Sequence, residues 1–313
     1  MINVEVDSFI FMLKILLLLL AVFSATIHRY NLRNMAQEHI RFDMMATPLT
    51  IEQTEIAAWA DLIDAAPDSF RNANGLRHQT IGGGMAINFQ KEPIPLFNRV
   101  IGLGLIEPLT QQVIDSIESF YGFHEKYLVH YSVPMRPPHA DSLLKQNGFF
   151  LAGSWERVVR NNEPLNDAEY GNGDIEVRQV DGSLKKSWIK FLIETYGFDF
   201  YEWPRAFALR PGWKHYVAFR DHKIVACRSF FTTKTKTVFS GVDAPVPGVM
   251  TPDCAPDFAI WRKAIADGLR EGVILFVADI ELPDKEKNTA AYEGFKQLGF
   301  YIPYTRYHYR LNE

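Results

Sequence analysis

A helix that ends at a glycine and turns directly into a strand occurs twice in this chain. Near the C-terminus, apolar residues recur at helical spacing over residues 288–298, and Gly299 follows where a left-handed C-cap is needed. Phe300 then opens a run of aromatic and β-branched residues, which favours a strand. Residues 145–149, Lys-Gln-Asn-Gly-Phe, repeat the ending Lys-Gln-Leu-Gly-Phe at residues 296–300. One such unit therefore closes each half of the chain.

Length and composition are those of a globular protein with room for two cores. The chain has 313 residues, 47% hydrophobic and 22% charged, which is enough for two domains of ordinary size. Its net charge of -4 gives no electrostatic reason to expect nucleic acid as a partner. Cys227 and Cys254, its two cysteines, can form neither a disulfide framework nor a zinc quartet, which favours a reducing compartment. The nine histidines show no metal-ligand spacing.

Residues 1–44 differ from the rest because residues 9–27 are almost wholly apolar. This stretch is long enough to span a membrane, and the basic residues that follow it would leave the rest of the chain in the cytoplasm. Read from Met12, it also resembles a signal peptide, although export suits the cysteine usage poorly. Any membrane contact is expected only through residues 9–27. The other reading is a later start of translation, at Met35, Met44 or Met45.

The first half, residues 45–160, alternates predicted helices and strands. Apolar residues at helical spacing predict a helix over residues 51–65, and Thr110 is suited to cap a helix over residues 110–120. Residues 78–89 are predicted as one strand that passes through a glycine triplet. The remaining predicted elements are strands at 97–105, 127–133 and 149–159 and a helix at 138–147.

The second half, residues 175–313, follows a polar stretch, residues 161–174, that is predicted to be a linker. Its predicted elements have the order β-α-α-β-β-β-α-β-α-β. A meander that leads into a helix and a core strand implies a mixed sheet with helices packed on it, of the α/β or α+β class. The predicted strands lie at 175–180, 215–220, 223–232, 237–242, 273–280 and from 300 onward, and the predicted helices at 183–196, 257–270 and 288–298, with an aromatic-rich segment at 199–209.

The closing segment of the second half resembles the last motif of the GNAT N-acetyltransferase superfamily, Asn-x-x-Ala-x-x-x-Tyr-x-x-Leu-Gly-Phe. Asn288, Ala291, Leu298, Gly299 and Phe300 match that pattern, and a phenylalanine takes the tyrosine position.

The first half is similar to a group of bacterial tandem GNAT proteins in residues 97–105 and 144–149. Together the resemblance extends over residues 47–311. It implies two GNAT-like domains, residues 45–160 and 175–313, each a mixed sheet flanked by helices. Any acetyl-CoA site is expected in the C-terminal one.

The resemblance also implies where the chemistry takes place. Acetyl-CoA is expected in a V-shaped opening between the parallel strands at 237–242 and 273–280, with its pyrophosphate on main-chain N–H groups at the start of the next helix. A base takes a proton from an acceptor amine, which attacks the thioester, and a hydroxyl protonates the departing thiolate. The acceptor is expected to be a small molecule or a peptide. Carried over residue by residue, the expected acetyl-CoA contacts are Val242, Val249, Met250, Cys254, Asn288 and Phe295.

The catalytic candidates follow from the same comparison. Asp243 and Glu281 come at or just past the ends of the two strands and are candidates for the base, although ordinary strand-end carboxylates have the same positions. Phe295 cannot donate a proton. Tyr292 lies about one turn earlier on the same helix and is the candidate acid, with a packing role as the alternative.

The chain departs from the family pattern in the loop that should hold the pyrophosphate. Residues 249–257 contain no arginine and no glycine. Pro252 and Pro256 each remove an N–H donor, and Asp253 and Asp257 place negative charge where phosphates would lie. Asp257 is expected to be an N-cap, which would compete with a diphosphate. Two functions are therefore open, an N-acyltransferase and a GNAT-fold pseudoenzyme that binds a ligand or a protein.

Two further groups of residues, 98–99 and 198–203, each allow two interpretations. Asn98 and Arg99 are polar residues inside an apolar strand, and they are expected either in an acceptor or inter-domain pocket or in a buried network. Residues 198–203 are rich in aromatic side chains, and they either line an acceptor pocket or form core beneath a loop.

Overall fold

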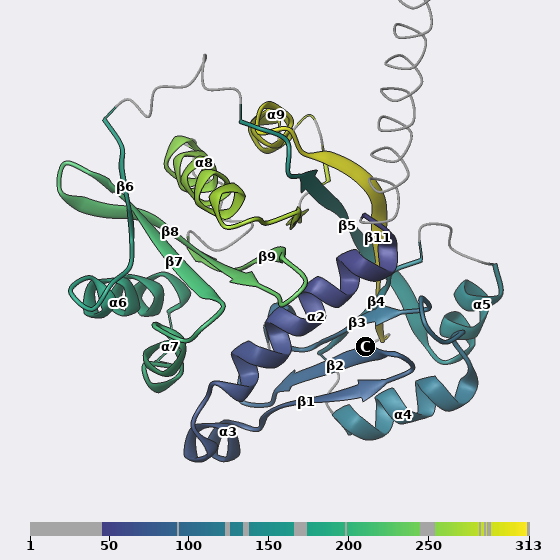
Figure 1. Cartoon of the computed structure of the whole chain (residues 1–313). Coiled ribbons are helices and arrows are strands. Elements are labelled where there is room, and N and C mark those ends of the chain that lie inside the picture. The colour runs from purple at the N-terminus through teal and green to yellow at the C-terminus, as the bar shows by residue number, and fades with distance from the viewer. Residues whose placement is uncertain are drawn as a thin grey trace, which may run out of the picture. The chain divides into compact units, whose positions relative to one another are not determined.

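One mixed β-sheet runs through both halves of the chain in the computed structural model (Figure 1). Its eleven strands lie in the order β1-β2-β3-β4-β11-β5-β10-β9-β8-β7-β6. The mixed α/β class predicted from the sequence is therefore confirmed. The strands are β1 (Leu76–Ile81), β2 (Gly84–Phe89), β3 (Arg99–Leu103), β4 (Leu128–Tyr131), β5 (Phe149–Asn161), β6 (Glu176–Gln179), β7 (Trp213–Arg220), β8 (Lys223–Thr232), β9 (Thr237–Ala244), β10 (Leu275–Ile280) and β11 (Tyr301–Leu311).

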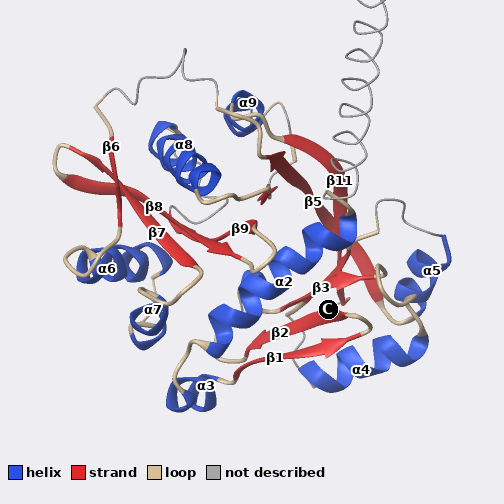
Figure 2. Ribbon diagram, in the orientation of Figure 1, coloured by secondary structure: helices blue, strands red, loops and turns tan. Residues whose placement is uncertain are grey.

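Helices cover both faces of this sheet (Figure 2). Three buried clusters of apolar side chains fill the space between the sheet and the helices. One lies beneath α2, α6 and α7, one beneath α8 and α9, and one beneath α4 and α5. The helices are α2 (Pro48–Asp64), α3 (Asp68–Asn74), α4 (Gln111–Tyr121), α5 (Pro138–Gln146), α6 (Lys185–Tyr196), α7 (Glu202–Phe207), α8 (Ala255–Arg270) and α9 (Thr289–Gln297), with a 3-10 turn at Pro95–Phe97.

The structure describes residues 46–311 with several gaps. The residues within this range that it does not describe are 93, 123–125, 134–137, 166–173, 198, 245–253, 282, 285, 287 and 288. Residues 9–27, the predicted apolar segment, lie outside the described part. Within that part, no helix combines the length and the apolar character needed to cross a membrane.

Local sequence signals set the ends of several elements as predicted. Gly148 and Gly299 adopt the left-handed backbone conformation, with φ of 79° and 81°, and each precedes a closing strand. Thr110 caps α4, because its hydroxyl accepts a hydrogen bond from the Val113 main chain at 3.4 Å. The predicted order of elements in the second half is also found.

The prediction of one strand over residues 78–89 is wrong, because this segment belongs to a hairpin. Gly82 and Gly83 have φ of 57° and 71°, and Ile81 pairs with Gly84. Two consecutive residues with positive φ form the tight turn that matches the twist of a hairpin, and glycine adopts that conformation without strain. The glycine triplet therefore separates β1 from β2.

The strand that closes each half lies beside a strand of the other half. β5 pairs antiparallel with β10, with Val159 opposite Val277. β11 pairs antiparallel with β4, with His308 opposite His130. β5 and β11 also pair with each other along most of their length. The two halves are thus joined in the middle of the sheet by exchanged closing strands.

Helix α2 crosses the middle of the sheet and places two buried carboxylates there (Figure 1). Arg157 of β5 donates to Glu52 at 2.8 Å and also to Glu55. Arg306 of β11 donates to Glu55 at 2.6 Å. Asp279 of β10 accepts hydrogen bonds from both arginines, at 3.0 and 2.9 Å. Burial opposes ionisation of Glu55, but Arg306 and Arg157 outweigh it and hold its pKa below the normal range. We name these five residues the central ion cluster.

Asn98 and Arg99 belong to two separate buried networks. Arg99 donates to Glu55 at 2.9 Å and lies over the ring of Trp59, with 5.0 Å from its guanidinium carbon to the ring centre. Asn98 instead fixes the turn before β3, because its side-chain oxygen accepts from the Phe89 main chain at 2.9 Å. The buried-network reading of these two residues therefore fits the structure.

Glu55→Gln should strongly destabilise the protein. Removal of one partner from a buried ion cluster leaves the other charges uncompensated, and this typically costs about 3–5 kcal/mol. The measurement is the free energy of unfolding from urea denaturation. Asp68→Asn is the control, because Asp68 is exposed in its pair with Arg71 and should change stability by less than about 1 kcal/mol. Equal effects of the two variants would contradict a structural role for the cluster.

Candidate functional site

The sheet opens between β9 and β10. These parallel strands pair over only three residue pairs, from Leu275 opposite Thr237 to Val277 opposite Phe239. Beyond that point β9 remains paired with β8 as far as Ala244, and β10 remains paired with β5 as far as Ile280. Each strand therefore keeps its outer neighbour while the ladder between them ends. The two strands are those for which the resemblance to the GNAT superfamily implies a V-shaped opening.

The equivalent strands of the first half do not open in this way. β3 and β4 are also parallel, but they are paired from Arg99 opposite Leu128 to Leu103 opposite Tyr131, at the end of both strands. Gly104, just past β3, lies so close to the Tyr131 ring that a Cβ there would be 2.7 Å from it. Aromatic packing closes the space that an opening would need. Among the described strands, the β3–β4 pair thus reaches the ends of both strands, with a register shift between Val100 and Leu103, whereas the β9–β10 pair ends before either strand does.

Asp243 lies near the end of β9, beside this opening. It is buried, with 5% of its surface exposed, and pairs with Arg228 of β8 at 2.9 Å. Burial raises the pKa of Asp243 to about 7, and the opposing charge of Arg228 only partly reduces that rise. Its carboxyl group can therefore exchange a proton near neutral pH.

Glu281 directly follows β10, on the other side of the opening. Burial raises the pKa of Glu281 to about 8, and the negative charges of Asp243 and Asp279 add to the rise. The effect of the Asp243 charge on the pKa of Glu281 indicates that the two carboxyl groups lie near each other. A base with a pKa close to the working pH is well suited to proton abstraction. The structure thus brings together the two predicted base candidates.

Tyr196, at the end of α6, is a third polar group of this region and was missed by the sequence reading. It lies near Asp243, whose charge and main chain both affect the pKa of Tyr196. Burial raises the pKa of Tyr196, and the charges of Asp243 and Glu281 add to the effect. The rings of Phe97 and Phe200 lie 6.2 and 5.7 Å from its ring. The sequence reading missed Tyr196 because a tyrosine at the end of an amphipathic helix looks like a packing residue.

Tyr292, the predicted acid, is half-buried on α9. It packs against the apolar cluster beneath α8 and α9. Burial raises its pKa above the usual value, and the nearby Glu156 carboxylate adds to that rise. Glu156 is opposite Ile280 in the sheet, so Tyr292 lies over the end of β10. The pKa of Glu281 is instead affected by the charges of Asp279 and Arg306 in the central ion cluster, which lies beneath α2. The acid and base candidates therefore belong to opposite faces of the sheet.

Asp257 is not the N-cap of α8, which corrects the sequence prediction. The helix begins at Ala255, and its N-cap, Cys254, makes no side-chain capping bond. Asp257 lies in the first turn and accepts two hydrogen bonds from Arg228, at 2.8 and 3.0 Å. Arg228 also donates to Ser240 at 2.8 Å. The sequence contained no local signal for this pairing, because Arg228 comes from a strand 29 residues earlier.

The other predicted acetyl-CoA contacts are dispersed. Val242 is buried in the cluster beneath α2 and α6. Phe295 is a core residue of α9, and its ring lies 5.6 Å from Trp261 and 5.0 Å from Phe300. Cys254 is half-buried at the start of α8. Three more lie outside the described residues: Val249, Met250 and Asn288.

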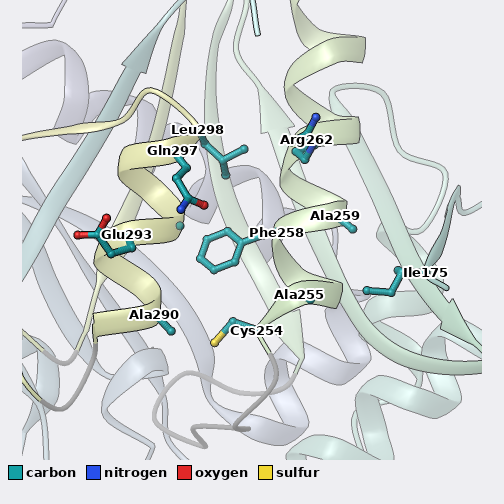
Figure 3. Close-up of a pocket in the computed structure, with 11 residues that line it drawn as sticks. Ile175, Cys254, Ala255, Phe258, Ala259, Arg262, Ala290, Glu293, Gln297 and Leu298 are labelled. Carbon is teal, nitrogen blue, oxygen red and sulfur yellow. The ribbon is translucent and has the colours of Figure 1, made fainter. Parts of the chain in front are cut away.

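A pocket of about 380 Å³ lies between α8 and α9 (Figure 3). Its lining is mostly apolar, with Cys254 at one end and Arg262 at the other. Phe258 projects from α8 into the space between the helices. It touches α9 at Gly294, where a Cβ would lie only 2.0 Å from the Phe258 ring. The two helices are therefore in contact around this aromatic ring.

Comparisons with known proteins identify the fold. No family model and no curated protein matches the sequence. The structure is similar to a GCN5-related N-acetyltransferase from Kribbella flavida, with a TM-score of 0.51 and 12% identity, over 80% of this chain and 95% of that one. It is also similar to one from Sphaerobacter thermophilus (TM-score 0.48, 16% identity, 68% and 71% of the chains) and to a tandem GNAT protein from the clavulanic acid biosynthesis pathway (0.44, 12%, 67% and 73%). The chain thus has the GNAT fold predicted from its sequence.

The raised pKa of Glu281 predicts that stability falls with rising pH. The unfolded carboxyl ionises near pH 4.5 and the folded one near pH 8, so its contribution to stability is complete below pH 4.5 and is lost as pH rises to 8. The free energy of unfolding should fall by about 1–2 kcal/mol less between pH 6 and 8 in Glu281→Gln than in the natural protein. Urea denaturation at several pH values measures this. Glu194→Gln, an exposed change on α6, is the control and should leave the pH dependence of stability unchanged. If Glu281→Gln also leaves it unchanged, the pKa of Glu281 is not raised.

Proposed function

We propose that this chain is a GNAT-type N-acyltransferase with its site in the second half. It would transfer an acyl group from a thioester such as acetyl-CoA to an amine of a small molecule or peptide. The observation that carries the proposal is the opening between β9 and β10, with Asp243 and Glu281 on either side of it. Fold alone would not be sufficient, because one fold supports many functions.

Glu281 is the proposed base. Asp243 is held by Arg228 at 2.9 Å, so its role is to attract and orient the cationic amine. Glu281 takes one proton from the acceptor ammonium, and the free amine attacks the thioester carbonyl. A carbon–nitrogen bond forms and the carbon–sulfur bond breaks. Tyr292 gives its proton to the departing thiolate and regains one from the new amide nitrogen, so the net proton released leaves through Glu281.

The described residues fit only part of acetyl-CoA. The free inner edges of β9 and β10 offer main-chain groups to the amides of a pantetheine arm, as strand edges do for extended chains. The start of α8, where the family binds the pyrophosphate, carries Asp257 with Pro256 beside it. We therefore assign the binding of the acyl-bearing arm to the opening between β9 and β10. We assign no phosphate-binding role to the start of α8.

The alternative function is a GNAT-fold module that binds a ligand or a protein without turnover. The same Arg228–Asp257 pair favours it, because family members that use acetyl-CoA need anion-binding groups at that position. Acyl transfer distinguishes the two functions. Transfer to no member of a broad panel of amines, although a thioester binds, would favour the module.

The acyltransferase proposal predicts a defined pH profile. With acetyl thioesters and a panel of amines, transfer followed by mass spectrometry should increase from pH 6 to 9, with an apparent pKa near 8 from Glu281. Glu281→Gln should lower kcat by about 100-fold, within the usual range for a lost general base, without weakening thioester binding. An unchanged kcat would eliminate Glu281 as the base.

Tyr292→Phe tests the acid. The loss of a general acid should reduce kcat by about 100-fold while KM changes little. Tyr301→Phe is the matched control, because Tyr301 is 44% exposed at the start of β11 and should retain the full rate. Full activity in Tyr292→Phe would assign the protonation of the thiolate to another group, with Tyr196 as the next to test.

A further inference from the structure

The first turn of α8 is already neutralised by the protein itself. Asp257 supplies the negative charge that a helix N-terminus attracts, and Arg228 binds that carboxylate through two parallel hydrogen bonds. The third nitrogen of the guanidinium group donates to Ser240, and Asp243 pairs with the same arginine. All three guanidinium nitrogens of Arg228 thus have partners, and only 15% of its side chain is exposed.

The charges around this turn oppose a diphosphate. Asp243 and Asp257 place two carboxyl groups around the single positive charge of Arg228. Pro256 has no N–H, so one of the donors that a helix start normally offers to phosphate is missing. To bind there, a diphosphate would have to displace Asp257 from Arg228 and leave a partly buried carboxylate without its partner, which is costly.

The nearest cations along α8 do not replace Arg228. Figure 3 places Arg262 at the opposite end of the pocket from Cys254. Lys263 donates to Asp267, at 2.7 Å, one turn further along the helix. Among the described residues, Arg228 is therefore the cation at the start of α8, and it is already paired with Asp257.

We propose that this site recognises its acyl donor by the acyl-pantetheine arm and makes no bond to the nucleotide diphosphate. The Arg228–Asp257 pair stands where that bond would form, while the opening between β9 and β10 is unaffected by it. This inference rests on the proposed acyltransferase function and defines its donor as an acyl-pantetheine thioester, whatever is attached beyond the arm.

The test compares acetyl-CoA with acetyl-pantetheine, which has no phosphate. Calorimetric titration of the full chain should give dissociation constants within about threefold of each other. Binding of acetyl-CoA should also change little between 50 and 500 mM salt, because contacts to phosphate are screened by salt and contacts of the arm are not. Acetyl-CoA binding more than tenfold tighter than acetyl-pantetheine, or strongly weakened by salt, would overturn the inference and leave the acyltransferase proposal standing.

Asp257→Asn provides a gain of binding as a second readout. It frees Arg228 for an anion, so it should tighten acetyl-CoA binding by about tenfold and leave acetyl-pantetheine unchanged. Glu271→Gln, at the other end of α8, removes a carboxylate that pairs with Lys214 and has no contact with Arg228, so it should change neither. Equal effects of Asp257→Asn on both thioesters would contradict the inference.

The outcomes separate the two proposals. If both thioesters bind equally but no amine is acylated, the acyltransferase function fails and the assignment of the arm holds. If neither thioester binds to the natural chain or to Asp257→Asn, both fail. The salt dependence requires no variant, so it decides the question even if Asp257→Asn does not fold.

Discussion

The interaction on which the rest of the structure depends is the central ion cluster between α2 and the crossing strands β5 and β11. Glu52, Glu55, Arg157 and Arg306 are almost completely buried, and each has a partner of opposite charge. Buried ions in such a setting are tolerated only when all of them are satisfied, because each unpaired one costs several kcal/mol. A slip of either strand by one residue would turn its arginine to the other face of the sheet. The cluster therefore selects one register for the strands that join the halves.

The candidate site inherits its geometry from this junction. β10 is held on one side by β5, a strand of the first half, and Asp279 of β10 is bonded to both arginines of the cluster. Glu281 comes two residues later, at the end of the same strand. Its position is thus determined by residues of the first half, although the opening is formed by strands of the second. This dependence gives the first half a structural role in the site even though its own parallel strands remain closed.

The sequence predicted those features that depend on neighbouring residues. The caps at Thr110, Gly148 and Gly299, the order of elements in the second half and the strands β9 and β10 were all found from local patterns. The features it missed involve distant residues. Arg306 meets Glu52 across 254 positions, and nothing near either residue indicates that partner. Arg228 and Tyr196 likewise reach the site from elements whose local patterns describe only a strand and an amphipathic helix.

The two halves differ at the start of the helix that connects their parallel strands. This helix is α4, between β3 and β4, in the first half and α8, between β9 and β10, in the second, and such a connection offers a helix start to an anion wherever the ladder opens. In the first half, Tyr131 packs against Gly104 and removes the space. In the second half the ladder is open, but Asp257 and Arg228 satisfy the helix start internally. The fold thus keeps an opening between β9 and β10 and has an ion pair at the start of α8. Under the proposed acyltransferase function, the two parts of donor recognition would be independent, because recognition of the arm depends on strand divergence and recognition of the diphosphate on one ion pair.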